Sequence, residues 1–321
     1  MELRLLFHSF KSRRDWHGNR ARPRMHKALK YALRCARRPG RQAAWLGFLD
    51  ADPSLRRIVA TQPRLYERWH HAYINRHLDG DRRLAIVRDH YAFVLSRWPA
   101  GVVESIYLGN GLPVGTLQLK DGSAARMELL RPVNKGTEGE LGLYLLDAAG
   151  RRLGCVVFTF ADGGRSLLIG CIQGALAHLG ADAVSRFTRQ SHGLRPKNLL
   201  LSMLYALASH HGATRLFGVG NAAHPFAGQN ARNGKGSRIK TDYDAFWQEC
   251  HGESMDDGFY RLPDSEPPRD VSKVESKHRS AFRRREWLRQ AACDLLVEAV
   301  GGTRLRDHAG PGALVPMLAT A

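Results

Sequence analysis

Two turn-centred segments in the middle of the chain limit the fold more than any other feature of the sequence. The first is VGTLQLKDGSAARMELLR at 114–131, in which alternating stretches flank Asp121-Gly122, a pair typical of tight hairpin turns. The second is GELGLYLLDAAGRRLGCVVFTF at 139–160, which repeats the arrangement around another small-residue turn. The apolar run SLLIGCIQGA at 166–175 supplies one more strand. Together these segments predict an antiparallel meander over about 113–175.

A helix and a buried strand are expected to follow the meander. Pro196 suits a first helical turn, because proline lacks the N–H that would have no partner there. The apolar face of this helix consists of Leu199, Leu200, Met203, Leu204 and Leu207. The run TRLFGVGN at 214–221 then predicts a strand that can lie parallel to its neighbour. The predicted fold class is therefore α+β, with a mixed, mostly antiparallel sheet and flanking helices.

The first hundred residues have a helical pattern instead. In RPRMHKALKYALRCARRPGRQ, Met25, Leu29 and Leu33 recur at helical spacing, and Pro39-Gly40 ends the pattern. A second basic helix is expected over VSKVESKHRSAFRRREWLRQAACDLLVEAV at 271–300. We therefore expect three parts, which are a basic helical region at 1–100, an α+β domain at 101–300 and a tail at 301–321.

The chain is strongly basic. It holds 49 Lys and Arg against 30 Asp and Glu, which gives a formal net charge of +19. Such a surplus attracts polyanions, so RNA, an anionic lipid surface and phosphorylated small molecules are all candidate partners. The candidate polyanion-binding residues in SKHRSAFRRREWL are Lys277, Arg279, Arg283, Arg284 and Arg285. A solvated basic helix face has the same pattern, and this alternative stays open.

The cysteines and the apolar runs bear on the compartment. Five cysteines are scattered without metal-ligand spacing, and they are Cys35, Cys155, Cys171, Cys250 and Cys293. This usage indicates a reducing compartment and no metal site. The N-terminal segment lacks a secretory signal, and no run approaches the roughly 20 apolar residues of a membrane-spanning helix. We therefore expect a cytoplasmic protein.

The loop before the predicted helix at Pro196 is the best candidate for a cofactor site. A helix N-terminus offers free amides and the positive end of the helix dipole, so it binds anions readily. The residues expected to hold a cofactor phosphate are Gly193, Leu194, Arg195, Lys197 and Asn198. In the alternative interpretation Gly193 only turns the chain, Arg195 pairs with a carboxylate and Lys197 is solvated.

The order of these segments resembles the layout of GNAT acyltransferases, in which a meander leads to a pyrophosphate loop, a helix and a strand ending near asparagine. The loop from Gln190 to Arg195 supplies the first glycine of the GNAT pattern, but Arg195 stands where Gly or Ala is usual. The resemblance implies transfer of an acyl group from acyl-CoA, or from another activated donor, to an amine. The catalytic candidates are His192, Asn221, His224, Asp242, Tyr243 and Glu249. Each of them can instead have a structural role.

Six segments in order also resemble the VirK/YbjX family of bacterial proteins. They are LLIGCIQGA, HGLRPKNLLLSMLYALA, GVGNAAH, YDAFWQECHG, DGFYRLP and SKHRSAFRRREWL, and the likeness spans about 100–290. The resemblance implies a Gram-negative source and a role in virulence-linked envelope stress, including resistance to antimicrobial peptides, without implying a reaction. Two functions stay open: a GNAT-like acyltransferase, and a non-enzymatic regulator that binds RNA or an anionic membrane.

Overall fold

The structure is a computed structural model, and it describes residues 3–13, 21–132, 136–175, 180–227 and 241–301. Its N-terminal part is helical, as the sequence predicts. The helices of this part are α1 (Leu3–Lys11), α2 (Ala21–Arg37), α3 (Pro39–Ala51), α4 (Pro53–Thr61), α5 (Gly80–Arg97) and α6 (Ala100–Tyr107). A 3-10 segment, Pro63–His70, lies between α4 and α5. Pro39 ends the pattern of α2 and begins α3, because proline fits a first turn but not a helix interior.

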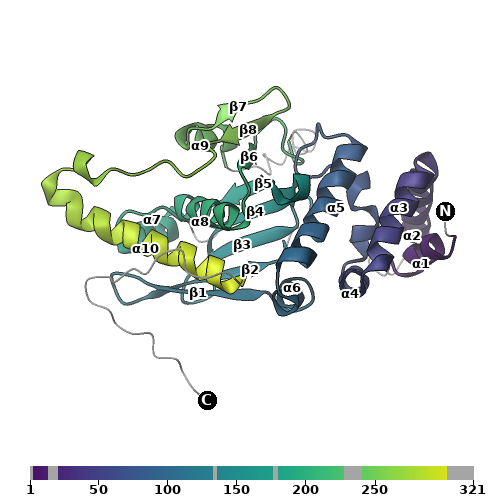
Figure 1. Ribbon diagram of the computed structural model, residues 1–321, viewed down its shortest axis with the longest axis horizontal. Coiled ribbons are helices and arrows are strands. Elements are labelled where there is room, and N and C mark those ends of the chain that lie inside the picture. The colour runs from purple at the N-terminus through teal and green to yellow at the C-terminus, as the bar shows by residue number, and fades with distance from the viewer. Residues whose placement is uncertain (1–2, 14–20, 133–135, 176–179, 228–240, 302–321) are drawn as a thin grey trace, which may run out of the picture.

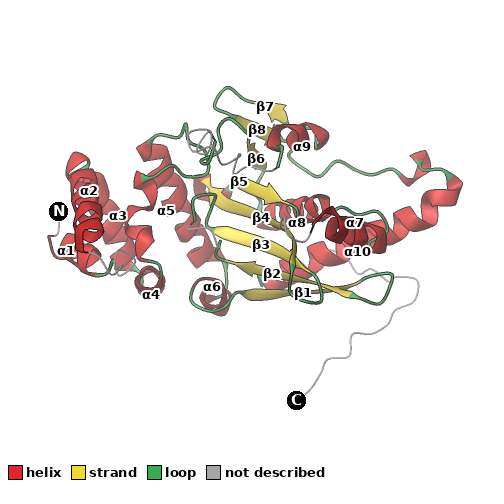
Figure 2. Ribbon diagram, turned by 180° about the vertical axis from the view of Figure 1, so that it is seen from behind, coloured by secondary structure: helices red, strands yellow, loops and turns green. Residues whose placement is uncertain are grey.

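One mixed sheet of eight strands forms the centre of the described chain (Figure 2). Its strands are β1 (Leu112–Gln118), β2 (Ala124–Leu130), β3 (Leu141–Leu146), β4 (Arg152–Ala161), β5 (Ser166–Gln173), β6 (Arg215–Val219), β7 (Glu253–Ser254) and β8 (Phe259–Leu262). Their order across the sheet is β1-β2-β3-β4-β5-β6-β8-β7. Only β5 and β6 pair in parallel, and every other neighbouring pair is antiparallel. The predicted fold class, the meander and the parallel strand after it are all confirmed.

Four further helices flank the sheet, and they are α7 (Gly180–Gln190), α8 (Pro196–His211), α9 (Tyr243–Glu249) and α10 (Arg279–Ala299). α8 packs on β3, β4 and β5, and α10 packs on α8 and β1 (Figure 1). α8 is buried beyond its predicted face, since Leu201 and Tyr205 are only 5% and 6% exposed. Cys250, Asp264 and Glu266 lie near Tyr205, and α10 packs on α8 as well. α10 begins at Arg279, later than predicted, because two 3-10 turns, Val271–Lys273 and Ser276–His278, precede it.

The N-terminal helices and the sheet share one hydrophobic core. The rings of Phe93 on α5 and Phe160 on β4 lie 4.3 Å apart between centroids. The boundary that we predict at residue 100 stays a prediction. The predicted tail lies outside the described residues from 302 onward. No helix in the described ranges is both long and apolar enough to cross a membrane.

One buried histidine and two half-buried ones predict a loss of stability in mild acid. His90 is fully buried, its Nδ1 accepts the Phe160 N–H at 3.3 Å, and its Nε2 lies 2.7 Å from the Tyr107 hydroxyl. Burial lowers the pKa of His90 to about 3 and the pKa values of His70 and His211 to about 4. A histidine in the unfolded chain has a pKa near 6.5. Below that pH the unfolded chain therefore binds protons that the folded chain does not bind.

We therefore expect the free energy of unfolding to decrease between about pH 6.5 and pH 4, by at most roughly 1.4 kcal/mol per pH unit for each of these histidines. Urea unfolding at several pH values measures this slope. Burial disfavours the Glu67 carboxylate, but His71 and Arg13 lower its pKa to about 2, so its contribution is lost only below about pH 4.5. Equal stability at the two ends of the histidine window would contradict the prediction.

Candidate functional site

The parallel strands β5 and β6 separate at their carboxyl ends. Their pairing stops where Ile169 lies opposite Gly218. β5 continues to Gln173 along β4, whereas β6 ends at Val219 beside β8. The sheet therefore opens between β5 and β6, and β5 has no β6 partner beyond Ile169.

α8 begins beside this opening without a capping side chain. Pro196 packs over β4, since a β-carbon placed on Gly154 would lie 3.2 Å from the Pro196 Cβ. The residue before the helix, Arg195, makes no side-chain capping hydrogen bond, and Leu199 is the first residue whose amide bonds back, to the Arg195 carbonyl at 3.0 Å. The amides of Lys197 and Asn198 thus have no acceptor within the helix. This N-terminus can bind an anion.

The predicted cofactor loop has a structural role as well. The Gly193 amide donates to the Thr188 carbonyl at 2.7 Å, and the Leu194 amide donates to the Ser191 carbonyl at 3.2 Å. Gly193 has φ +90, a left-handed conformation that favours glycine, and it follows the end of α7. The amides of Gly193 and Leu194 are therefore already engaged, while those of Lys197 and Asn198 are not. Cofactor binding by all five residues stays a prediction.

The two cations of the loop lie in different surroundings. Arg195 forms an exposed ion pair with Glu249 at the end of α9, as the alternative interpretation expects. Lys197 is half-buried, and its Nζ lies 5.2 Å from the centre of the Phe246 ring. Burial and the neighbouring Arg195 lower the pKa of Lys197. The structure thus places Glu249, a catalytic candidate, as the partner of a cofactor candidate.

α10 brings part of the predicted polyanion set to the same loop. Arg285 Nη1 lies 3.5 Å from where a β-carbon on Gly193 would stand. Burial, followed by the charges of Arg284 and Lys120, lowers the pKa of His192, which favours a neutral ring. Cations from α10 and from the turn between β1 and β2 thus lie near His192 and Gly193, in the loop that leads into α8.

The rest of the polyanion set has local partners or faces solvent. Lys277 pairs with Glu275 at 2.9 Å, and Arg279 Nε donates to the Val274 carbonyl at 3.0 Å. Arg283 is exposed. Polyanion binding by the five residues stays a prediction.

Asn221 and Asp242 join β6 to α9. Asn221 Nδ2 donates to Asp242 Oδ1 at 2.8 Å, and Asn221 Oδ1 accepts the Tyr243 amide at 2.9 Å. Asp242 also accepts the Ala245 amide at 3.1 Å, so it caps α9. These hydrogen bonds lower the pKa of Asp242 and keep it ionised. Both side chains have a structural role here, and their catalytic role stays a prediction.

His224 and Tyr243 lie beneath that junction, away from solvent. The His224 ring is 1% exposed and stacks on Tyr243, with ring centroids 5.2 Å apart. Its Nδ1 accepts the Phe226 amide at 3.2 Å, and its Nε2 lies 3.2 Å from Glu138 Oε1, outside hydrogen-bond geometry. Burial and the Cys171 thiol raise the pKa of Tyr243, so its hydroxyl keeps its proton. Glu138 was not among the site residues predicted from the sequence. The only signal for it was that a carboxylate stands next to a glycine just before a strand.

A protein-family model described as "Protein of unknown function (DUF535)" matches residues 20–295. The chain belongs to this family. It is 29% identical over 259 residues to "Uncharacterized protein YbjX" of Escherichia coli (strain K12), a match that covers 80% of this chain and 78% of that protein. The resemblance to the VirK/YbjX family is thereby confirmed. An "Uncharacterized protein" of Haemophilus influenzae is 31% identical over 146 residues, which cover 45% of this chain and 47% of that protein.

Among solved structures, this DUF535 member is weakly similar to a cAMP-binding acyltransferase from Mycobacterium smegmatis. The TM-score is 0.29 at 11% identity, and the match covers 68% of this chain and 60% of that chain. The likeness is too weak to assign a site.

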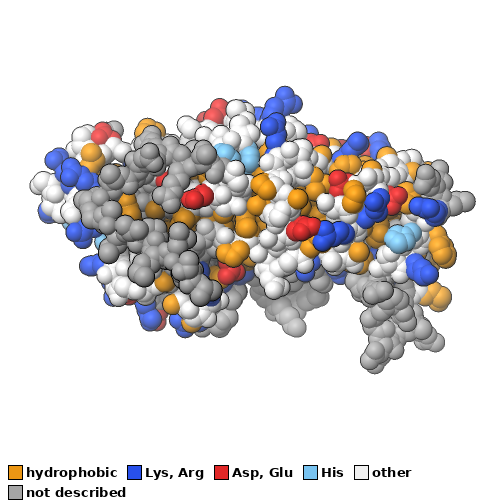
Figure 3. All heavy atoms as spheres, turned by 60° about the horizontal axis from the view of Figure 1, so that its bottom comes forward, with side chains coloured by type: hydrophobic (Ala, Val, Ile, Leu, Met, Phe, Trp, Pro, Cys, Tyr) orange, Lys and Arg blue, Asp and Glu red, His pale blue; other side chains and the backbone are white. Residues whose placement is uncertain are grey.

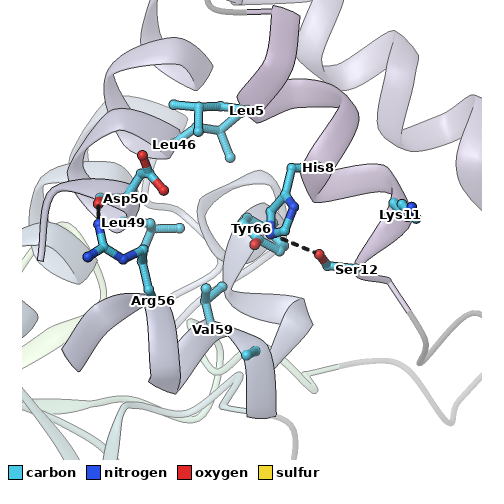
Figure 4. A pocket seen from close by; sticks show the side chains of 11 residues that line it. Leu5, His8, Lys11, Ser12, Leu46, Leu49, Asp50, Arg56, Val59 and Tyr66 are labelled. Carbon is cyan, nitrogen blue, oxygen red and sulfur yellow. Dashed lines mark hydrogen bonds between the residues drawn. The ribbon is translucent and has the colours of Figure 1, made fainter. Parts of the chain in front are cut away.

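A cavity of this DUF535 member lies far from the α8 site, among the N-terminal helices (Figure 4). It has a volume of about 460 Å³, with Leu49 and Tyr66 among the apolar lining residues and His8, Lys11 and Arg56 among the polar ones. Ser12 and His8 bond to each other there at 3.2 Å. No cluster of three or more His, Cys, Asp or Glu side chains suited to a metal ion occurs in the described part of the chain.

Proposed function

We propose that this chain transfers an acyl group from a phosphate-bearing activated donor, such as a CoA thioester, to an amine. One observation carries the proposal: the uncapped start of α8 lies at the opening between β5 and β6, and cations from separate elements lie near the loop that leads into it. Lys197 belongs to α8, Lys120 follows β1, and Arg284 and Arg285 belong to α10. Such a site suits a ligand whose phosphates stay at the surface while its acyl end enters the sheet.

The phosphates would be bound by amides and cations together. The amides of Lys197 and Asn198 lie at the positive end of α8, and Lys197 adds a charge that is half shielded from water. Arg195 would exchange the Glu249 carboxylate for a phosphate. This exchange costs little, because an ion pair as exposed as this one contributes at most about 1 kcal/mol.

The acyl carbonyl would lie where β5 leaves β6. A backbone amide of β5 beyond Ile169 can donate to the thioester oxygen and stabilise the oxyanion that develops there. The amine attacks the carbonyl carbon, the C–S bond breaks, and the thiol leaves with a proton that the amine gives up. The ionised Asp242 would attract the acceptor as an ammonium ion, which releases a first proton to solvent to become the attacking amine. The family resemblance adds a cell-envelope setting to this proposal.

Arg195→Ala/Lys197→Ala tests the proposal through ligand-dependent thermal unfolding. CoA, acetyl-CoA, a long-chain acyl-CoA, ATP and a short RNA are compared at low and moderate salt. A ligand at a hundred times its Kd adds about 2.7 kcal/mol to the stability of a chain that binds it only when folded. We expect the CoA compounds to raise the midpoint of the wild type at both salt levels and not to raise that of the double variant.

Arg151→Ala/Arg261→Ala is the control for charge, since it removes two positive charges, as the test variant does, but takes them from exposed ion pairs elsewhere. It should keep the full response. Release of free CoA thiol in the presence of amines then measures transfer itself. A response to CoA compounds that both double variants retain, or binding without any thiol release, would overturn the acyltransferase proposal.

A second candidate function is polyanion binding through α10 without catalysis. One observation favours it: Trp287 is 50% exposed on the same helix as the exposed Arg283 and Arg284. Aromatic and basic side chains together suit a nucleic-acid strand. A midpoint shift with RNA alone, lost in moderate salt and kept in Arg195→Ala/Lys197→Ala, would favour this function over transfer.

A further inference from the structure

α2 exposes a row of large apolar side chains. Met25, Leu29 and Leu33 are 72%, 58% and 51% exposed, and their spacing of four residues places them along one side of the helix. Tyr31 and Cys35, on another side of α2, are buried against the rest of the protein. The apolar surface of α2 is therefore wider than the protein covers, and its outer part, which we call the α2 strip, faces solvent.

Positive charge borders the α2 strip. Lys30 and Arg37 are exposed, lie three residues before and four residues after Leu33, and form no ion pair with any described residue, whereas Arg34 is 3.3 Å from Glu67. From residue 11 to residue 41 the sequence has twelve Lys or Arg and one acid, Asp15. Figure 3 shows hydrophobic and basic side chains together at the end of the molecule that the N-terminal helices form.

We propose that the α2 strip and its bordering cations dock onto the surface of an anionic lipid bilayer. A helix in this position buries its apolar side chains at the boundary between headgroups and acyl chains, and its cations meet the anionic headgroups. Met25, Leu29 and Leu33 match the first requirement, and Lys30 and Arg37 match the second. An anionic bilayer therefore matches both the apolar strip and the cations that border it.

Two other possible partners of this surface, RNA and a second copy of the chain, would each match only its cations or only its apolar side chains. RNA would neutralise the cations but leave Met25, Leu29 and Leu33 in water, because aliphatic side chains offer no stacking surface to bases. A second copy of the chain would cover the strip but bring two clusters of positive charge together, and three side chains are few for a stable interface. The charge and the composition of the strip therefore point to anionic lipid.

The test is sedimentation of the full chain with vesicles, with Leu29→Ser/Leu33→Ser as the strip variant and Lys30→Ala/Arg37→Ala as the charge variant. Vesicles of phosphatidylcholine alone are compared with vesicles that also contain about one quarter phosphatidylglycerol, which carries the negative charge. We expect wild-type binding only to the anionic vesicles. The strip variant should bind about tenfold more weakly, and the charge variant about fivefold more weakly for each cation removed.

The matched control makes the same kinds of change at Met255, Arg151 and Arg261, which are also exposed and belong to neither proposed binding site. Met255→Ser/Arg151→Ala/Arg261→Ala should keep wild-type vesicle binding. Thermal midpoints check that every variant folds. If the strip variant does not fold, the charge variant still tests the proposal.

Three results would overturn the proposal. The first is equal sedimentation of wild type and both α2 variants with anionic vesicles. The second is RNA binding that requires Lys30 and Arg37 in the absence of vesicle binding. The third is a dimer in solution that the change at Leu29 and Leu33 converts to a monomer without vesicle binding by either form.

Discussion

Replacing Glu140 with alanine is expected to lower the free energy of unfolding by about 3–5 kcal/mol. Glu140 is 2% exposed, and its Oε1 lies 2.9 Å from Arg68 Nε. Its Oε2 accepts the Tyr91 hydroxyl at 2.8 Å, and its amide donates to Thr159 Oγ1 at 3.1 Å. The change removes the carboxylate that balances a buried guanidinium and leaves a buried hydroxyl without its acceptor, and both losses are costly inside a core.

Urea unfolding measures this effect, with Glu104→Ala as the control. Glu104 also pairs with an arginine, Arg57, but both side chains are about half exposed, so we expect a loss of no more than about 1 kcal/mol. The double variant Arg68→Met/Glu140→Leu removes both charges and should regain much of the stability, because well-packed apolar residues can replace a buried ion pair. A loss in Glu140→Ala no larger than that in Glu104→Ala would show that Arg68 does not depend on this carboxylate.

The elements of the fold were predictable because their signals are local. Asp121-Gly122 sets a hairpin within its own neighbourhood, and Pro196 sets a helix start from the geometry of its ring. The pairings that build the site are not local. Glu138 reaches His224, and Arg285 reaches Gly193, across long stretches of chain, and no periodicity encodes which distant residues meet. The sequence therefore predicted a phosphate-binding loop but not the cations of α10 that face it.

The second large effect on the free energy of unfolding is expected at Gly170, because the segment that carries Glu138 crosses the sheet there. In the ladder between β4 and β5, Val157 lies opposite Cys171 and Phe158 lies opposite Ile169, so Gly170 is the extra residue of a β-bulge. A β-carbon on Gly170 would stand 2.0 Å from the carbonyl oxygen of Glu138. A backbone oxygen cannot rotate away, so Gly170→Ala must move either β5 or the segment that carries Glu138.

We expect Gly170→Ala to cost about 1–3 kcal/mol in the free energy of unfolding, as overpacking does in well-packed cores. Gly47→Ala is the matched control. A β-carbon on Gly47, within α3, would meet nothing within 4 Å, so alanine should be neutral or stabilise by up to about 1 kcal/mol. If Gly170→Ala is as stable as wild type, the Glu138 carbonyl does not lie over β5 as described.

Gly170→Ala also distinguishes two effects: a displacement of the Glu138 segment, and the loss of the ion pair of Glu140. Moving the segment displaces the carboxylate that lies 3.2 Å from His224 Nε2, so the imidazole nitrogen resonances of His224 should shift in Gly170→Ala. In Arg68→Met/Glu140→Leu the backbone at Glu138 is free to stay in place, and those resonances should stay near their wild-type positions. Because His224 stacks on Tyr243, which follows the α9 cap Asp242, a shift confined to Gly170→Ala would show that the bulge in β5 sets the geometry beneath the proposed acyl site.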